Sequence, residues 1–455
     1  MDWLDRTVAG RVIRPDAADY DDARRTFNSL IDRRPAAVVR CTDDADVRAT
    51  IEAAREEGLP LGVRGGGHSV AGSAIVDAGI VADLSGMRGV ETDAAGRVAH
   101  VQGGAQWRDL DGPALAHGLA VPGGVYGDTG VGGLTLGGGI GFLMGIGGLT
   151  CDNLVGARVV TADGSIVEAE DDPDLLWALR GGGGNFGAVT RFDLALHPIG
   201  PMYGGAVVLP LADGAAIRRY STLMREAPDE LLPMLVIGRD EDGDLLLQLQ
   251  FAYVGDAAIG EQFARAILGN AWPGADVLRA CSYLDIQSIN AIEPFGSRNY
   301  WSSTFVTDLD DDLIDVLLHA APTIPTSASG ILIEPMHGAA RRHGTDHAAF
   351  ANRLARSHLS FIGTWDDPSF DEAGTAWSRG MTARIGPWSS GGLYVNYSMP
   401  GEAVSSRIQD RARAAYPPEV FERLQAVKRR HDPDNLFRGN LNIPPGGPPG
   451  GPPGD

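Results

Sequence analysis

The chain has 455 residues, of which 44% are hydrophobic and 21% are charged, a composition typical of globular rather than disordered proteins. A formal net charge of −21 at pH 7 disfavours nucleic acid, anionic membranes and polyanions as partners. This length exceeds one ordinary core and predicts two domains of roughly 200 residues each.

The first residues, Met1 to Arg6, lack the basic and apolar regions of a signal peptide. No run of about 18 apolar residues suggests a membrane span. The three cysteines, Cys41, Cys151 and Cys281, are odd in number and far apart, which disfavours a disulfide framework. We therefore expect a cytoplasmic protein, and we predict no metal site.

In chain order, the first strong pattern is a helix over 46–58, preceded by the acidic, capping residues 43–46. The apolar run 59–63 predicts a strand, and Arg64-Gly65-Gly66-Gly67-His68-Ser69 follows it directly. A strand that feeds such a turn can bring backbone N–H groups close to a phosphate.

Two further glycine clusters follow, at 130–141 and 181–187. Three clusters within this part of the chain favour one long anionic ligand over a purely structural role. The spacing around Gly137 to Gly141 does not give the G-x-G-x-x-G and acidic residue of a Rossmann unit, and no P-loop sequence occurs. A large cofactor with phosphate groups, bound by another fold, is the remaining interpretation.

The segment 154–168 predicts a hairpin that turns at Asp163-Gly164, and 174–180 predicts a short helix that ends at glycine. Pro198 to Pro201 interrupts the pattern, and we place a domain boundary there.

The second half of the chain differs in texture, because strand-like runs at 245–253 and 330–334 alternate with helical stretches such as 257–268. This pattern predicts an antiparallel sheet with covering helices, and an α+β protein as a whole. A helix is expected over 418–430. The Pro/Gly-rich residues 444–455 are expected to form a flexible tail.

The order and content of these motifs resemble the FAD-linked oxidases of the berberine bridge enzyme-like group, which share the fold of vanillyl-alcohol oxidase and p-cresol methylhydroxylase (PCMH). The resemblance runs from about Tyr20 to Ile443. Its motifs lie at 33–39, 64–72, 123–141, 148–154, 181–190, 394–397, 432–437 and 440–443.

The resemblance implies a two-domain α+β flavoprotein with a PCMH-type FAD-binding domain over 1–199, whose core is about 33–199. An antiparallel-sheet substrate-binding domain is expected over 200–399. Residues 400–443 are expected to return to the FAD domain.

The resemblance also implies that His68 forms a covalent bond to the flavin ring of FAD. Many relatives add a second bond through a cysteine, but Tyr126 occupies that position here, and Cys151 is interpreted as a small buried residue. We therefore expect one covalent bond. The other residues expected to contact the cofactor are Arg64, Gly65, Gly66, Gly67, Ser69, Gln102, Thr129, Gly132, Gly133, Thr135, Asn153, Gly187, Val189, Asn396, Asn440 and Asn442.

The motif Tyr394-Val395-Asn396-Tyr397 is the best catalytic candidate. In the family its second tyrosine acts as a base near the flavin, which implies that role for Tyr397, supported by Tyr394. A phenol must be activated by positive charge or hydrogen bonds to act as a base. If the motif is a strand, alternation puts Tyr394 and Tyr397 on opposite faces. Substrate-side alternatives are Arg298, Tyr300 and Glu334.

The predicted function is oxidation of a small-molecule alcohol, amine or sugar by hydride transfer to FAD, with oxygen as acceptor and hydrogen peroxide as product. Thr129 aligns with the position that admits or blocks oxygen in relatives, and its size, close to that of valine, is compatible with access. The alternatives are a dehydrogenase with another electron acceptor and a catalytically silent flavin-binding protein. The sequence does not identify the substrate.

Overall fold

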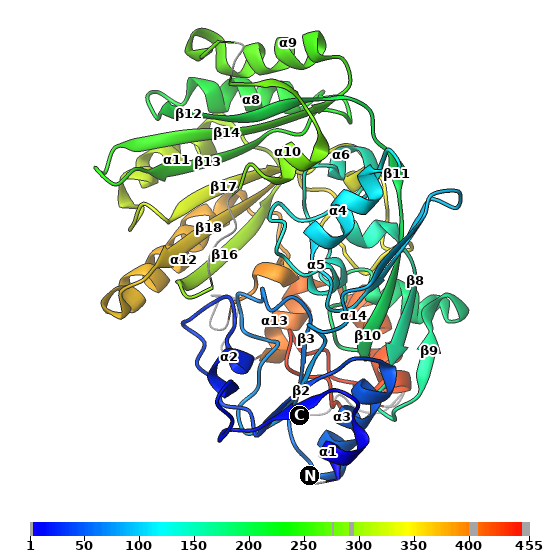
Figure 1. Ribbon diagram of the computed structural model, residues 1–455. Coiled ribbons are helices and arrows are strands. Elements are labelled where there is room, and N and C mark those ends of the chain that lie inside the picture. The colour runs from blue at the N-terminus through cyan, green and yellow to red at the C-terminus, as the bar shows by residue number, and fades with distance from the viewer. Residues whose placement is uncertain (1–2, 275–276, 291–294, 400–407, 448–455) are drawn as a thin grey trace.

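A computed structural model of the chain describes residues 3–274, 277–290, 295–399 and 408–447. Two lobes, each built on β-sheets with helices beside them, lie one above the other in Figure 1. The predicted α+β class is confirmed, and the second sheet domain is antiparallel throughout, as expected. Among the described residues, no helix is long and apolar enough to cross a membrane.

The first lobe begins with a four-stranded sheet in the order β1-β2-β4-β3. β2 and β3 both lie parallel to β4, and β1 is antiparallel to β2. The predicted helix in this region is confirmed as α3, whose N-cap Asp43 accepts a hydrogen bond from the Asp46 N–H. The elements are α1 (Leu4–Thr7), β1 (Arg11–Ile13), α2 (Tyr20–Arg24), β2 (Ala37–Arg40), α3 (Asp44–Glu56), β3 (Leu61–Arg64) and β4 (Ile80–Asp83).

The same lobe contains a five-stranded antiparallel sheet in the order β5-β6-β10-β8-β9. The predicted hairpin is confirmed as β8 and β9, and the predicted short helix as α7. The elements are β5 (Val90–Asp93), β6 (Val98–Gln102), α4 (Trp107–Leu115), β7 (Leu119–Ala120), α5 (Val131–Leu136), α6 (Met144–Gly147), η1 (Thr150–Asn153), β8 (Leu154–Val160), β9 (Ile166–Glu168), η2 (Ala169–Asp171), α7 (Pro173–Leu179), β10 (Ala188–Ala195) and β11 (His197–Pro198).

The second lobe is a seven-stranded sheet in the order β15-β12-β14-β13-β17-β18-β16. One face packs its alternate side chains against the helices α8, α9, α11 and α12, and the other face packs against the first lobe. The strands are β12 (Met202–Pro210), β13 (Met234–Arg239), β14 (Leu245–Val254), β15 (Arg279–Cys281), β16 (Arg298–Val306), β17 (Gly330–Pro335) and β18 (Ser357–Trp365). The helices are α8 (Ala215–Met224), α9 (Ala257–Leu268), α10 (Tyr283–Gln287), α11 (Asp311–Ala320) and α12 (Asp371–Ile385), with short 3₁₀ turns η3 (Gly269–Ala271), η4 (Ala321–Thr323), η5 (Gly338–Arg341), η6 (Pro368–Phe370), η7 (Gly386–Trp388) and η8 (Val395–Tyr397).

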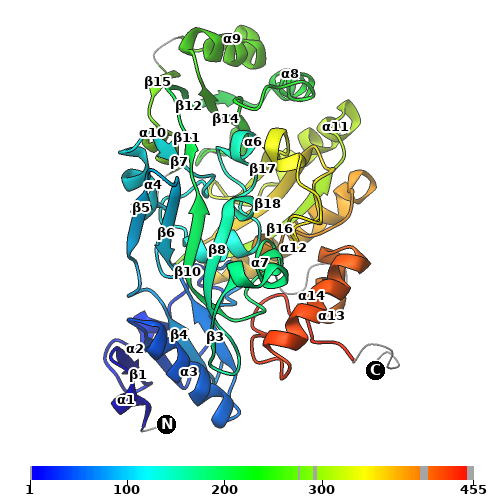
Figure 2. The same ribbon diagram turned by 90° about the vertical axis from the view of Figure 1, so that its right-hand side faces the viewer.

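The last two helices, α13 (Ile408–Ala415) and α14 (Pro418–His431), pack on the first lobe beside α7, as Figure 2 shows. The segment 197–202 joins β11 of the first lobe to β12 of the second. We propose 1–199, 200–399 and 400–443 as the limits of the units; 400–407 and most of the predicted flexible tail (448–455) lie outside the described residues.

A buried lysine ties the C-terminal segment to the first lobe. The Lys428 ammonium donates to the carbonyls of Asn185 and Phe437, at 2.8 and 2.7 Å, and to the Asp432 carboxylate at 2.6 Å. The Asp432 carboxylate also accepts from the backbone N–H groups of Leu436 and Phe437. Both charged side chains are fully buried, and this burial lowers the pKa of Lys428.

We expect Lys428→Met to lower the free energy of unfolding by about 3–5 kcal/mol, because it leaves the Asp432 carboxylate buried without a cation. Arg48→Met is the matched control, since Arg48 and Glu52 form an exposed ion pair with the same four-residue spacing on a helix. Its expected cost is below about 1 kcal/mol. Denaturant unfolding of both variants measures the difference, and similar losses in the two would contradict the role given to Lys428.

Candidate active site

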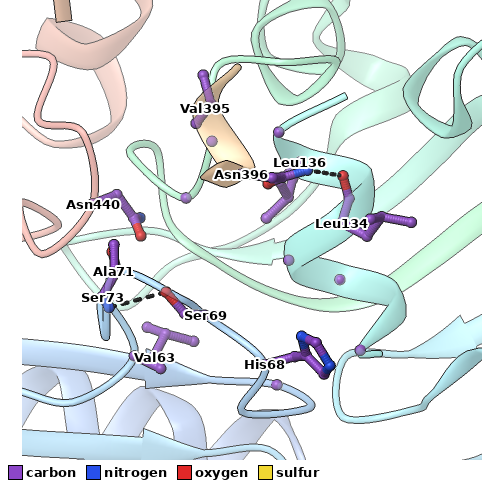
Figure 3. A pocket seen from close by; sticks show the side chains of 18 of the residues that line it. Val63, His68, Ser69, Ala71, Ser73, Leu134, Leu136, Val395, Asn396 and Asn440 are labelled. Carbon is purple, nitrogen blue, oxygen red and sulfur yellow. Dashed lines mark hydrogen bonds between the residues drawn. The ribbon is translucent and has the colours of Figure 1, made fainter. Parts of the chain in front are cut away.

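A cavity of about 360 Å³ lies between the glycine-rich loops of the first lobe, η8 and the C-terminal segment. Figure 3 looks into this cavity, with His68 and Ser69 on the loop after β3, Asn396 on η8 and Asn440 on the C-terminal segment. Segments that are far apart in the sequence therefore line the same cavity.

Two of the glycine loops touch through their backbones. A Cβ atom on Gly66 would lie 2.5 Å from the Cα of Gly130, and one on Gly130 would lie 2.6 Å from the Gly66 nitrogen. The next residue, Gly67, has a φ of +74°, in the left-handed region that favours glycine. At Gly133, by contrast, a Cβ would meet nothing within 4 Å. The glycines therefore bring the loops together and leave backbone facing open space.

His68 lies in the wall of the cavity and is half-buried. Its ring stacks on Phe27, with centroids 4.1 Å apart and an interplanar angle of 15°. Nε2 has no hydrogen-bond partner among the described residues. Burial lowers the pKa of His68, against the opposing effect of the Asp128 charge. The imidazole is therefore neutral at pH 7 and keeps a free lone pair.

The segment that carries Phe27 bridges the two lobes. The Asn28 amide donates to the carbonyls of Val70 and Asn299, at 2.7 and 2.8 Å, and its oxygen accepts from the Asn299 N–H at 2.8 Å. The Phe27 N–H donates to the Gly67 carbonyl. The His68 loop is thus held from behind by an N-terminal segment that is itself bound to β16.

The expectation that Tyr394 to Tyr397 form a strand is wrong, because Val395–Tyr397 is the 3₁₀ turn η8 with Tyr394 as its N-cap. In a 3₁₀ turn, residues three apart lie above one another. The Tyr397 N–H donates to the Tyr394 carbonyl, and the two rings are 4.8 Å apart between centroids. Because the motif is not a strand, alternation does not place the two tyrosines on opposite faces. Both rings lie on the same side of the turn.

The two tyrosines nevertheless have different surroundings. Tyr397 lines the cavity, whereas Tyr394 is buried behind it and its pKa is raised by that burial. The Tyr394 hydroxyl accepts from the N–H groups of Gly139 and Ile140, both at 3.2 Å, and from the Asn396 amide at 3.1 Å. Tyr394 thus ties η8 to the second glycine cluster.

Most of the predicted site residues meet at the cavity. Those that line it are Gly65, Gly66, Gly67, His68, Ser69, Thr129, Gly132, Gly133, Gly187, Val189, Asn396, Tyr397 and Asn440.

Six predicted residues, Tyr394 included, are absent from the described lining, and the side chains of four others bind neighbouring backbone. Arg64 donates to the Ala23 carbonyl and Thr135 to the Val131 carbonyl, while Gln102 accepts from the Gly89 N–H. The Asn153 amide donates to the carbonyls of Gly147 and Leu149. Asn442 is the sixth. Contact between these residues and a cofactor stays a prediction.

The sequence analysis missed three arginines that line the cavity, Arg33, Arg411 and Arg438. No carboxylate is among the described lining residues, although the chain carries a net charge of −21. Arginines and backbone N–H groups in a cavity wall suit an anionic ligand. The signal in the sequence that could have identified such an arginine is a basic residue close to a family motif, as Arg438 is, two positions before Asn440.

The structure also describes the two residues that were considered for a second covalent bond to the flavin. Tyr126 lines the cavity, with its ring 6.1 Å from that of His68. Cys151 is fully buried away from the described lining, and burial raises the pKa of its thiol. A thiol with a raised pKa is a poor nucleophile.

The two lobes also meet through a buried carboxyl group. Gln287 on α10 donates to the Asp111 carboxyl on α4 and to the Gly124 carbonyl, both at 3.0 Å. Gly124 lines the cavity. Burial raises the pKa of Asp111 to about 7.

Two family models and known proteins match this chain. The family model "FAD binding domain" matches residues 35–170, and "Berberine and berberine like" matches 393–444. The chain is 31% identical to (R)-6-hydroxynicotine oxidase of Paenarthrobacter nicotinovorans, over 97% of this chain and 98% of that protein.

Solved structures show the same likeness. The crystal structure of 6-hydroxy-D-nicotine oxidase from Arthrobacter nicotinovorans has a TM-score of 0.86 at 27% identity, covering 96% of this chain and 98% of that one. Phl p 4, a grass pollen allergen with glucose dehydrogenase activity, has a TM-score of 0.86 at 21% identity, covering 97% and 98% of the two chains. At this identity the second match shows the fold alone.

We expect Asp111→Asn to stabilise the protein increasingly as pH rises from about 4 to 7. The folded pKa lies above the unfolded value near 3.9, so the native state holds more protons and wild-type stability falls over this range. The full difference is about 4 kcal/mol at most above pH 7. Denaturant midpoints of both proteins at several pH values measure it, and parallel pH dependences would contradict the assignment.

Proposed function

This chain belongs to the berberine bridge enzyme-like family of FAD-linked oxidoreductases, and we propose that it oxidises a small-molecule alcohol, amine or sugar through FAD bound covalently to His68. Oxygen is the proposed electron acceptor, with hydrogen peroxide as the product. The observation that carries the proposal is the buried Nε2 of His68, which has no hydrogen-bond partner among the described residues and lies in the wall of a cavity built from glycine loops.

The residues of the cavity fit FAD. The open backbone at Gly133 and the arginines of the wall suit a diphosphate, because they supply fixed N–H donors and positive charge. A neutral imidazole with a free lone pair is the nucleophile that a bond to the flavin requires. When bound, FAD supplies the hydride acceptor, and His68 holds its ring in place.

Tyr397 is the proposed base. It lines the cavity, and its ring packs edge-to-face on Trp301, with centroids 5.1 Å apart. Its oxygen would take the proton of the substrate hydroxyl or amine as the C–H hydride departs. Tyr394 would act only indirectly, because its hydroxyl is occupied by Gly139, Ile140 and Asn396.

Oxygen access rests on Thr129, which lines the cavity and is half-buried. Its side chain is close in size to valine, which supports an oxidase. The second candidate is a dehydrogenase with another acceptor. Anaerobic bleaching of the flavin by a panel of alcohols, sugars, cyclic amines and aromatic natural products identifies the substrate, and reoxidation with oxygen or a quinone then separates the two candidates.

We expect acid-precipitated wild-type protein to stay yellow and the tryptic peptide 65–88, which contains His68, to carry the mass of FAD. His68→Ala should bind part of its FAD without a covalent bond and oxidise substrate more slowly, because the phosphate contacts lie elsewhere in the cavity. Cys151→Ser is the control and should keep covalent flavin. Release of all flavin from wild type by acid, or an adduct on Cys151, would refute this attachment.

We expect Tyr397→Phe to slow flavin reduction by on the order of 10²–10⁴, the range for loss of a general base. The ring contacts with Trp301 remain, so folding and flavin content should be unchanged. Tyr394→Phe is the matched comparison: it should cost less in rate, and it loses the acceptor of three N–H groups. Stopped-flow anaerobic reduction measures both, and an undiminished rate in Tyr397→Phe would assign the base elsewhere.

A further inference from the structure

A buried carboxylate and imidazole face each other on the substrate-side sheet. Glu334 on β17 is directly opposite His358 on β18 in the antiparallel register. Glu334 Oε2 and His358 Nδ1 are 2.7 Å apart, and the two side chains are 1% and 0% exposed. Both lie on the face of the sheet that packs against the first lobe, since Ile333 and Leu359 beside them join the helix-covered core.

His358 also contacts both tyrosines of η8. Its ring centroid is 5.1 Å from that of Tyr394, with the rings nearly perpendicular, and 5.7 Å from that of Tyr397, with an angle of 35°. The titratable groups that the described contacts place against His358 are Glu334, Tyr394 and Tyr397. Its other described contacts are with uncharged residues: Ser360 Oγ lies 3.4 Å from Nδ1, and Phe305 packs on the ring.

The hydrogen bond to Glu334 determines which nitrogen of His358 is free. A carboxylate only accepts, so Nδ1 carries the proton and donates it to Glu334, which leaves the lone pair on Nε2. Nε2 is buried and has no partner among the described residues. His358 is therefore oriented by a carboxylate, and its ring packs against that of the proposed base, although Nε2 and the Tyr397 hydroxyl do not form a hydrogen bond in this structure.

We propose that His358, oriented by Glu334, is the positioning residue that receives the hydroxyl proton of Tyr397 when this tyrosine acts as base. Tyr394 is not the proposed donor, because burial raises the pKa of its hydroxyl and its side chain does not line the cavity. The inference rests on the function proposed for Tyr397. A phenol that acts as a base at neutral pH needs a neighbouring group that stabilises its deprotonated form, and His358 would supply that group.

The proton balance closes within these three side chains. The substrate hydroxyl or amine gives its proton to the Tyr397 oxygen, and the Tyr397 proton moves to Nε2 of His358. Glu334 accepts from Nδ1–H throughout and thereby stabilises the imidazolium. The two electrons of the substrate C–H bond leave as hydride to the bound FAD, so no further oxidant or acid is needed.

The test compares His358→Gln and Glu334→Gln with His337→Gln in the FAD-loaded protein. His337 is a suitable control because it is also buried, directly after β17, and has no described ring contact with either tyrosine. The first measurement is the rate of anaerobic flavin reduction against pH. The second needs no substrate: NMR of protein isotope-labelled at the tyrosine Cζ follows phenol ionisation, and Tyr397→Phe assigns the signal.

In wild type and His337→Gln, we expect flavin reduction to rise with pH, because the proposed transfer requires a proton acceptor that has lost its own proton. In His358→Gln the rise should shift to higher pH by at least about one unit, which is a factor of about 10 in rate at neutral pH. The Tyr397 phenolate signal should shift in the same direction. Glu334→Gln should shift both more modestly, and it carries the test if His358→Gln does not fold.

Unchanged pH profiles and an unchanged Tyr397 signal in both variants would overturn the proposal. A lower rate in His358→Gln with the pH profile of wild type would also overturn it, because that result indicates a merely structural role. Failure of the proposed function looks different: Tyr397→Phe would then reduce its flavin at the wild-type rate, while the NMR comparison would still report whether His358 and Tyr397 share a proton.

Discussion

The contact between the backbones of Gly66 and Gly130 is the constraint on which the site depends. Neither position has room for a Cβ, so the loop that carries His68 and the segment that carries Thr129 meet with nothing between them. The proposed attachment residue, His68, and the proposed oxygen-gating residue, Thr129, therefore line the same cavity. A side chain at either glycine would separate these two functions, however well each loop kept its own conformation.

The sequence correctly predicted those secondary-structure elements that depend on a local pattern of residues. The hairpin of β8 and β9, helix α3 with its Asp43 cap and the antiparallel second sheet follow from periodicity and turn residues. The Tyr394 to Tyr397 motif was located correctly but given the wrong conformation, because an aromatic-rich run of four residues resembles a strand. The Tyr394 hydroxyl instead accepts from the N–H groups of the distant residues Gly139 and Ile140 and from the Asn396 amide within the turn.

Other parts of the site could not be predicted from sequence, since they depend on contacts between distant segments. Glu334 was only one of several substrate-side alternatives, and His358 carried no local signal at all. Their significance appears only when β17 and β18 pair in register and η8 packs against them. Similarly, Arg33 and Arg411 reach one cavity from opposite ends of the chain. We therefore propose that the backbone of the first lobe binds the cofactor, while side chains of the second lobe determine what reacts with it.

The bridge made by Asn28 has a consequence for the order in which the protein is assembled during synthesis. Asn28 binds Val70 and Asn299, so the support behind His68 joins residues that leave the ribosome far apart in time. The wall that contains Asn440 is made later still. A nascent first lobe has its glycine loops but not the finished cradle. We therefore expect stable capture of the cofactor to follow translation, in chains whose two lobes and C-terminal segment have already come together.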